Sequence, residues 1–194
     1  TITGVQNIFN SGVDISATIN SGGTQSISSG GIASATIVNS GGSQALSAGA
    51  TASSATIYGI QNILSGGVDL SGVIHSGGVQ NIASGGIASA GAVNDGGTQN
   101  VSSGAAAIST TINSGGTQNL YSGGIASAVI VSSGGIQNVS SGAIVMAVVI
   151  SSTQNVSSGG VSTDDQITSN GTQNVGAGAA TVSTTVNGSQ NRGN

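Results

Sequence analysis

Residues 115–124 read GGTQNLYSGG, and nearly the same phrase, GGTQNVSSG, occupies residues 96–104. A glutamine lies at the centre of each copy and returns at regular intervals through the 194 residues of the chain. Neighbouring glutamines are 19 residues apart in seven intervals and 17 in three. A fixed period near 20 residues is typical of a solenoid. The series is Gln6, Gln25, Gln44, Gln61, Gln80, Gln99, Gln118, Gln137, Gln154, Gln173 and Gln190.

Positions counted from each glutamine form columns, and two of these columns are always aliphatic. The second residue after the glutamine is Ile, Leu or Val in all ten repeats, and the thirteenth is always Ile or Val. The fifth is Gly in nine repeats, with Ser11 as the exception, and Gly suits the backbone angles of a turn. The short repeats lose residues only at the turn before the next glutamine, at 56–62, 149–155 and 185–191. Each repeat is therefore predicted to contain two strands joined by turns.

Between the Gly turn and the second aliphatic column, the residues alternate with a period of two. One parity, which ends at positions such as Val131, is expected to face the core, and the other, with Ala126 and Ala128, to face outward. This period favours strands over helices. A Gly- and Ser-rich chain can also be a disordered linker, but the periodic Ile, Val and Thr argue against that. The prediction is an all-β parallel solenoid of about ten rungs, one domain over residues 1–194, with rungs about 4.8 Å apart.

Composition excludes several classes of protein. The chain has one Arg, no Lys and five acidic residues, whereas nucleic-acid binding needs many cations to neutralise phosphates. No apolar run is long enough to cross a membrane as a helix, so we expect no membrane insertion by this segment. The first residue is Thr1 rather than Met, and we expect the chain to be a fragment of a longer exported protein.

The inventory of reactive side chains predicts no enzyme, no cofactor and no metal site. His75 is the only histidine and shares a turn column with Asn20 and Asn39, so we expect a solvated turn residue rather than a general base. Asp14 and Asp69 share a column but lie three rungs apart, about 14 Å by strand spacing, which is too far for the paired carboxylates of a glycosidase.

The remaining acids give no stronger signal. Asp95 is an isolated turn residue, and Asp164 and Asp165 are adjacent. Residues next to each other on a strand point to opposite faces, so Asp165 would point inward unless a local bulge at STDDQ redirects it. A metal site there is the functional alternative. The turns lack the repeated Asp of calcium-binding β-rolls.

The glutamines share the parity of the buried aliphatic column, so they are predicted to point inward. A buried amide must be hydrogen-bonded, and a stack of identical amides satisfies this need. We therefore expect a structural Gln ladder, with a ligand-binding row as the alternative. The residue after the glutamine is Asn in nine positions and is expected to face outward. A second Asn column near the other turn, which includes Asn20 and Asn39, is expected to cap turns rather than contact glycans.

The outward parity of the second strand predicts a flat strip of small, uncharged side chains. Such a strip suggests a self-association face, so copies of the chain are the expected partner. The alternative is ligand binding, of glycans or ice, by repeated Thr, Ser and Asn columns such as Thr18, Thr56, Thr111 and Thr185. The predicted self-association residues are Ala33, Ala35, Ile37, Ala88, Ala90, Ala92, Ala126, Ala128, Ile130, Val145, Ala147 and Val149.

The stretch GTQSISSGGIASATIVNSGG at residues 23–42 resembles the AIDA-type repeat of bacterial autotransporter adhesins. The resemblance runs from about Gln6 to Asn191. It implies a right-handed parallel β-helix on the bacterial cell surface, with roles in adhesion, autoaggregation and biofilm formation. Some members of the family are O-glycosylated on Ser and Thr of these repeats by heptosyltransferases. Assembly into a filament or layer is a further expected form of self-association, and host or matrix glycans are further expected partners. The chain departs from the family in carrying less charge, and attachment to the surface through the family's membrane-embedded β-barrel is implied by the resemblance.

Overall fold

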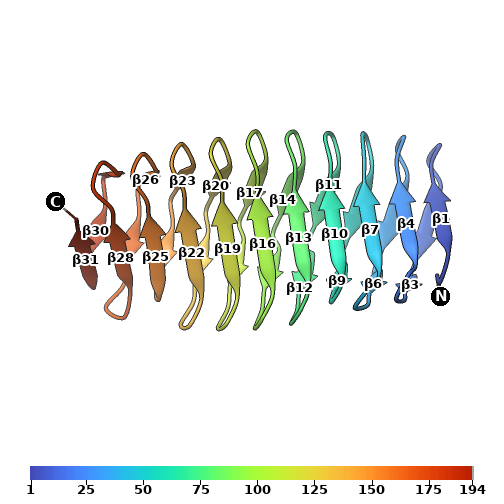
Figure 1. Cartoon of the computed structure of the whole chain (residues 1–194), viewed down its shortest axis with the longest axis horizontal. Helices are drawn as coiled ribbons and strands as arrows, with labels where there is room; N and C mark the ends of the chain where they lie inside the picture. Colours follow the sequence, from blue (N-terminus) through green and yellow to red (C-terminus); the bar gives the residue numbers. More distant parts are fainter. Residues whose placement is uncertain (194) are drawn as a thin grey trace.

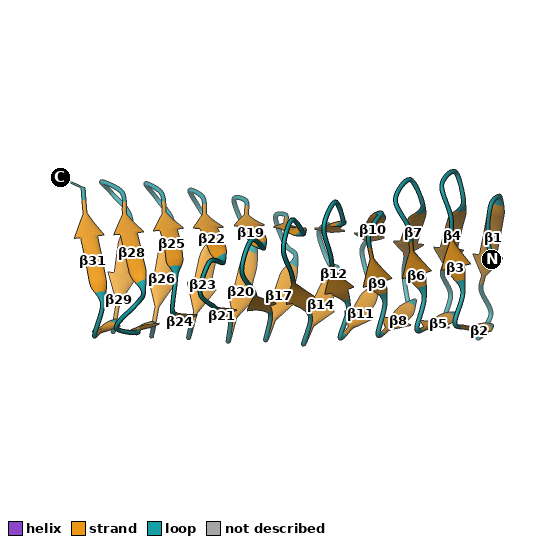
Figure 2. Ribbon diagram, turned by 90° about the horizontal axis from the view of Figure 1, so that it is seen from below, coloured by secondary structure: helices purple, strands orange, loops and turns teal. Residues whose placement is uncertain are grey.

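A computed structural model describes residues 1–193, and it is a rod built from strands and turns (Figure 1). The 31 strands of the described part form three parallel sheets of 11, 10 and 10 strands that run the length of the rod. Figure 2 shows the strands stacked from one end to the other. The predicted parallel β-solenoid of about ten coils is confirmed, while residue 194 of the predicted domain lies outside the described residues.

Each sheet takes one strand from every coil, and we name the sheets by their composition. The Gln sheet contains β1 (Val5–Ile8), β4 (Thr24–Ile27), β7 (Ser43–Leu46), β10 (Ile60–Ile63), β13 (Val79–Ile82), β16 (Thr98–Val101), β19 (Thr117–Leu120), β22 (Ile136–Val139), β25 (Thr153–Val156), β28 (Thr172–Val175) and β31 (Ser189–Arg192). The apolar sheet contains β2 (Val13–Ile15), β5 (Ile32–Ser34), β8 (Thr51–Ser53), β11 (Val68–Leu70), β14 (Ile87–Ser89), β17 (Ala106–Ile108), β20 (Ile125–Ser127), β23 (Ile144–Met146), β26 (Val161–Thr163) and β29 (Ala180–Val182). The narrow sheet contains β3 (Thr18–Ile19), β6 (Ile37–Val38), β9 (Thr56–Ile57), β12 (Val73–Ile74), β15 (Ala92–Val93), β18 (Thr111–Ile112), β21 (Ile130–Val131), β24 (Val149–Ile150), β27 (Gln166–Ile167) and β30 (Thr185–Val186).

A coil contains three strands, so the prediction of two strands per repeat was wrong. The second predicted strand is divided by a corner ten residues after each glutamine. Every corner residue is a non-glycine residue with φ between 53° and 60°. This left-handed conformation turns the chain and reverses the alternation of side chains that follows it. The corner residues are Ser16, Ala35, Ser54, Ser71, Ala90, Ser109, Ala128, Ala147, Asp164 and Ser183.

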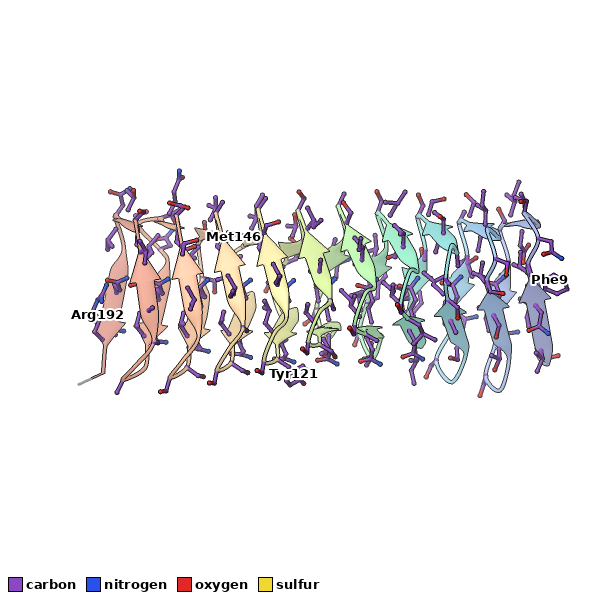
Figure 3. The ribbon with its side chains drawn as sticks, turned by 90° about the horizontal axis from the view of Figure 1, so that it is seen from above. Phe9, Tyr121, Met146 and Arg192 are labelled. Carbon is purple, nitrogen blue, oxygen red and sulfur yellow. The ribbon has the colours of Figure 1, made fainter. Side chains whose placement is uncertain are left out.

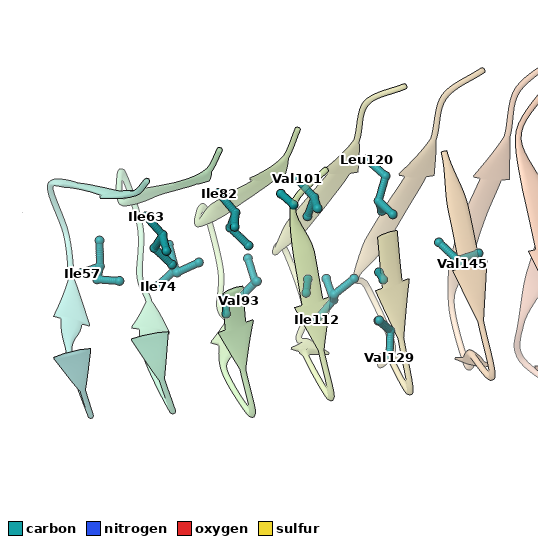
Figure 4. Packing of buried hydrophobic residues seen from close by; sticks show 14 of the residues in the cluster. Ile57, Ile63, Ile74, Ile82, Val93, Val101, Ile112, Leu120, Val129 and Val145 are labelled. Atoms are coloured by element: carbon teal, nitrogen blue, oxygen red, sulfur yellow. The ribbon is translucent and has the colours of Figure 1, made fainter. Parts of the chain in front are cut away.

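The core is a set of aliphatic columns that run along the axis between the three sheets (Figure 4). Ile82, Val101 and Leu120 belong to the column two residues after the glutamine, and each is fully buried. Val93 and Ile112 belong to the column thirteen residues after it and are buried as well. Strands pair in register, so side chains at equivalent positions of neighbouring coils contact one another. This stacking buries apolar surface that no single coil could bury alone.

Candidate functional surfaces

The glutamines form one continuous ladder inside the rod, as predicted. In each coil Nε2 donates to Oε1 of the glutamine in the preceding coil, at 2.5–2.8 Å, over all eleven residues. The glutamines from Gln25 to Gln173 are at most 1% exposed. Arg192, which Figure 3 labels, donates from Nε to Gln190 Oε1 at 3.0 Å. Because the ladder is closed to solvent in the middle of the rod, its glutamines there offer no surface to a ligand.

Asparagines form parallel ladders on the outside. Along the Gln sheet, side-chain amides from Asn62 to Asn191 are linked by hydrogen bonds of 2.9–3.1 Å. The second column contributes two short ladders, Asn39 to Asn20 and Asn113 to Asn94. Between them lie Tyr58 and His75, whose rings stack with centroids 4.8 Å apart.

Two carboxyl groups lie inside the rod beside the Gln ladder. Asp69 is 1% exposed and accepts from Gln80 Nε2 at 2.8 Å and from Gln61 Nε2 at 3.4 Å. Space for it comes from Gly72, because a Cβ at that glycine would lie 2.1 Å from Asp69 Oδ2. Burial raises the pKa of Asp69 to about 6, against the opposing effect of the two hydrogen bonds.

Asp165 is also buried, and the bulge suggested for STDDQ does not occur. Asp164 takes the left-handed corner position, so Asp165 points inward at the start of the next segment. Asp165 Oδ2 accepts from Ser162 Oγ and from Gln173 Nε2, and Oδ1 accepts from the Val148 amide. Burial raises the pKa of Asp165, the hydrogen bonds oppose this, and the charge of Asp164 adds to it. Asp14 has one such contact, from Gln25 Nε2 at 2.8 Å.

The acids and the histidine do not come together as a reactive centre. Within residues 1–193 no group of three or more His, Cys, Asp or Glu side chains could hold a metal ion. In the same part of the chain, no helix has the length and apolar character that crossing a membrane requires. Asp95 lies on an exposed turn, away from the buried acids.

The predicted self-association residues do not form one face, and this prediction is corrected. Ala33, Ala88, Ala126 and Val145 are buried, at 2% exposure or less. The four corner residues Ala35, Ala90, Ala128 and Ala147 have positive φ. Ile37, Ala92, Ile130 and Val149 lie on the narrow sheet. The prediction failed because it assumed one unbroken alternation of inward and outward residues. The left-handed corner reverses this alternation.

The outer side of the apolar sheet is instead formed by positions seven and nine after each glutamine, and we call it the apolar face. Its outward positions carry no charged residue, because the aspartates of these strands point inward. Met146 belongs to this face (Figure 3). Its exposed large side chains are Val13, Ile15, Ile32, Leu70, Ile87, Ile108, Ile125, Ile144, Met146 and Val182.

The predicted threonine array is not continuous. Thr18, Thr56 and Thr111 are half-buried on the narrow sheet, and Ile37 and Ile130 interrupt their column. The column therefore mixes hydroxyl, aliphatic and amide side chains in no regular order.

The turn serines form two exposed rows that sequence reasoning did not single out. Ser103 Oγ lies over the glycine of the next coil, since a Cβ at Gly123 would be 2.5 Å from it. Ser114 has the same relation to Gly134 at the other turn, also at 2.5 Å. The recurrence of a Ser-Gly pair at the same place in most turns was the available signal.

Comparison with solved structures identifies the repeat family. The chain matches the crystal structure of a TibC-catalysed hyper-glycosylated TibA fragment, residues 55–350, with a TM-score of 0.84 and 37% sequence identity. The match covers 100% of this chain and 79% of the TibA fragment. The chain belongs to the TibA/AIDA-like repeat family. Searches with protein-family models and of curated proteins gave no match.

Membership of the TibA/AIDA-like family agrees with the regular part of the sequence. The Gln ladder repeats once in every coil, and the turn serines and the exposed aliphatic residues of the apolar face recur in most coils. The buried acids and the Tyr58–His75 pair occur at single coils. These single-coil features are therefore properties of this TibA/AIDA-like chain and not of its repeat.

Proposed function

We propose that the chain is a structural and adhesive rod of a bacterial surface protein, which associates with further copies of itself through the apolar face. The observation that carries the proposal is the uncharged, largely apolar face, on which Ile87, Ile125 and Ile144 are 38–39% exposed in separate coils. Large contiguous apolar surfaces are typical of interaction sites. The relation to TibA supports a surface location.

A second copy of the chain is the partner that this face fits. The face repeats at the strand spacing, so two copies present the same periodicity to each other. The chain has six charged side chains in 194 residues, and none of them projects from the apolar face, so like-charge repulsion between copies is weak. Lysines, which commonly prevent association of exposed strands, are absent from the sequence.

Charge placed on the apolar face tests this proposal. The double variant Ile87→Lys with Ile125→Lys is expected to remain monomeric at concentrations where the unmodified chain associates in sedimentation velocity. The matched control is Asn81→Lys with Asn119→Lys, which adds the same charge to the same two coils on the Gln sheet. The control should associate nearly as the unmodified chain does. Equal loss of association in both variants would assign the effect to net charge alone.

We further propose that the exposed turn serines accept sugars, because the related TibA fragment is hyper-glycosylated in a TibC-catalysed reaction. Incubation with TibC and its sugar donor should add several sugar masses, located by peptide mapping at turn serines such as Ser103 and Ser114. Ser89, on a strand of the apolar sheet, should stay unmodified. Modification confined to strand serines would contradict the proposal.

A further inference from the structure

The turns between the narrow sheet and the Gln sheet form a backbone ladder of their own. In this ladder a turn N–H donates to the turn carbonyl of the next coil. Gly77 donates to Gly96 at 3.1 Å, Gly96 to Gly115 at 3.1 Å, and Gly115 to Gly134 at 3.0 Å. Each turn therefore donates one hydrogen bond to the next turn and accepts one from the preceding turn.

Two of the short repeats interrupt this ladder between full-length turns, and they do so differently. No projecting loop precedes β10 or β25, as the lower edge of the rod in Figure 1 shows. Before β25, Ser152 replaces the missing turn, and its Oγ accepts from the Gly134 amide at 3.1 Å. Before β10 the corresponding residue is Gly59, which has no side chain to do this. Within residues 1–193, the Gly41 amide and the Gly77 carbonyl are left without a protein partner.

The break before β10 is an open notch in the row of turns. A Cβ at Gly77 would find its nearest neighbour, the Tyr58 carbonyl oxygen, 3.9 Å away. At the equivalent Gly96 and Gly134, a serine of the preceding coil would lie 2.5–2.7 Å from such an atom. The walls of the notch are the turns that contain Gly41 and Gly77. One coil lies between these two turns, so they are roughly 10 Å apart by strand spacing. Tyr58, which is 39% exposed and stacked on His75, belongs to the coil between these two turns.

We propose that this notch binds an N-acetylated hexose. The acetamido group takes the place of the missing turn residue: its carbonyl accepts from the Gly41 N–H, and its own N–H donates to the Gly77 carbonyl. A trans amide points these two groups in opposite directions, as the ladder requires. The methyl group and the C–H surface of the sugar contact the exposed part of Tyr58. This site does not depend on self-association through the apolar face.

The dimensions and chemistry of the notch favour a sugar over a peptide. Besides the Gly41 N–H and the Gly77 carbonyl, the break leaves the Tyr58 carbonyl without a protein partner in the described part of the chain. An acetamido group satisfies the first two and a hydroxyl of the sugar can donate to the third, whereas a peptide strand would bring further backbone groups without partners. His75 is the titratable side chain that contacts Tyr58. Among residues 1–193, no carboxylate or lysine is placed at the notch to favour a charged ligand. An aromatic side chain with a few polar groups of fixed position is typical of small-ligand sites.

The test is a nuclear magnetic resonance titration of the ¹⁵N-labelled chain with methyl 2-acetamido-2-deoxy-β-D-glucopyranoside. The Gly41 amide should shift with a Kd on the order of millimolar, and saturation of the protein should transfer to the acetyl methyl protons. Methyl β-D-glucopyranoside, which lacks the acetamido group, should bind at least about tenfold more weakly.

The most specific variant inserts Ser-Gly between Tyr58 and Gly59, which restores the turn of a 19-residue repeat and keeps every residue of the notch. This insertion should abolish the shift, whereas Tyr121→Ala, at an exposed tyrosine elsewhere, should leave it unchanged. An absent Gly41 shift, equal binding of the glucoside or binding that survives the insertion would each overturn the proposal. Tighter binding of N-acetylglycinamide than of the acetamido sugar would also overturn it, in favour of a peptide.

Discussion

Gln118→Leu is expected to lower the free energy of unfolding by about 4 kcal/mol, because it leaves two buried polar groups without partners at about 1–3 kcal/mol each. Gln118 Nε2 donates to Gln99 Oε1 at 2.6 Å and Gln118 Oε1 accepts from Gln137 Nε2 at 2.8 Å. All three glutamines are buried, so water cannot replace either bond. Urea denaturation followed by far-ultraviolet circular dichroism measures the change.

Asn119→Leu is the matched control, since Asn119 is the next residue and also makes two ladder bonds, at 3.1 and 2.9 Å. Its amide is only partly buried, so water can take over the bonds of Asn100 and Asn138. The free energy of unfolding should therefore fall by less than about 1 kcal/mol. Equal destabilisation by the two variants would show that burial of the Gln ladder adds nothing to its strength.

Asp69→Asn is expected to raise stability at neutral pH and to flatten its dependence on pH. Burial raises the pKa of Asp69 from 3.8 to about 6, so between these values the folded chain binds a proton that the unfolded chain has released. The stability contributed by this proton is complete below pH 3.8 and is lost as the pH rises through 6. At pH 7.5 the loss amounts to about 3 kcal/mol at 1.36 kcal/mol per pH unit.

Thermal unfolding at pH 4.5 and pH 7.5 gives the measurement. The unmodified chain should be more stable at pH 4.5, and Asp69→Asn should remove most of that difference, with Asp165 supplying a remainder of the same sign. Asp95→Asn removes a charge from an exposed turn and serves as the control. Greater stability of the unmodified chain at pH 7.5 than at pH 4.5 would contradict the role given to Asp69.

The features that repeat in every coil could be predicted from the sequence. The period of the glutamines and the two aliphatic columns predicted the solenoid and the buried Gln ladder, because in-register stacking places identical residues against one another. The corner after the second strand was missed because its residues are Ala, Ser or Asp rather than Gly. The exclusion of β-branched residues from that column was the available signal, since a left-handed backbone disfavours them.

The features confined to single coils could not be predicted in the same way. Asp69 depends on the space that Gly72 leaves, and the notch at Tyr58 depends on which atom occupies the position of Ser152 in the other short repeat. These are relations between coils in three dimensions. Alignment of the repeats shows that residues are missing from a turn, but it does not show which hydrogen-bonding groups their absence leaves without a partner.

Every amide of the Gln ladder donates toward the same end of the rod, and the outer Asn ladders run in the same sense. Aligned amide dipoles add along their common axis, as they do in a helix. The side-chain amides thus give a chain with few formal charges an electrical direction, with its positive pole toward residue 1, which the N–H groups of the turn ladder partly offset because they donate toward the other end. Two such rods lying side by side attract when these directions oppose and repel when they agree, so the ladder that holds each rod together also favours an antiparallel arrangement of neighbours.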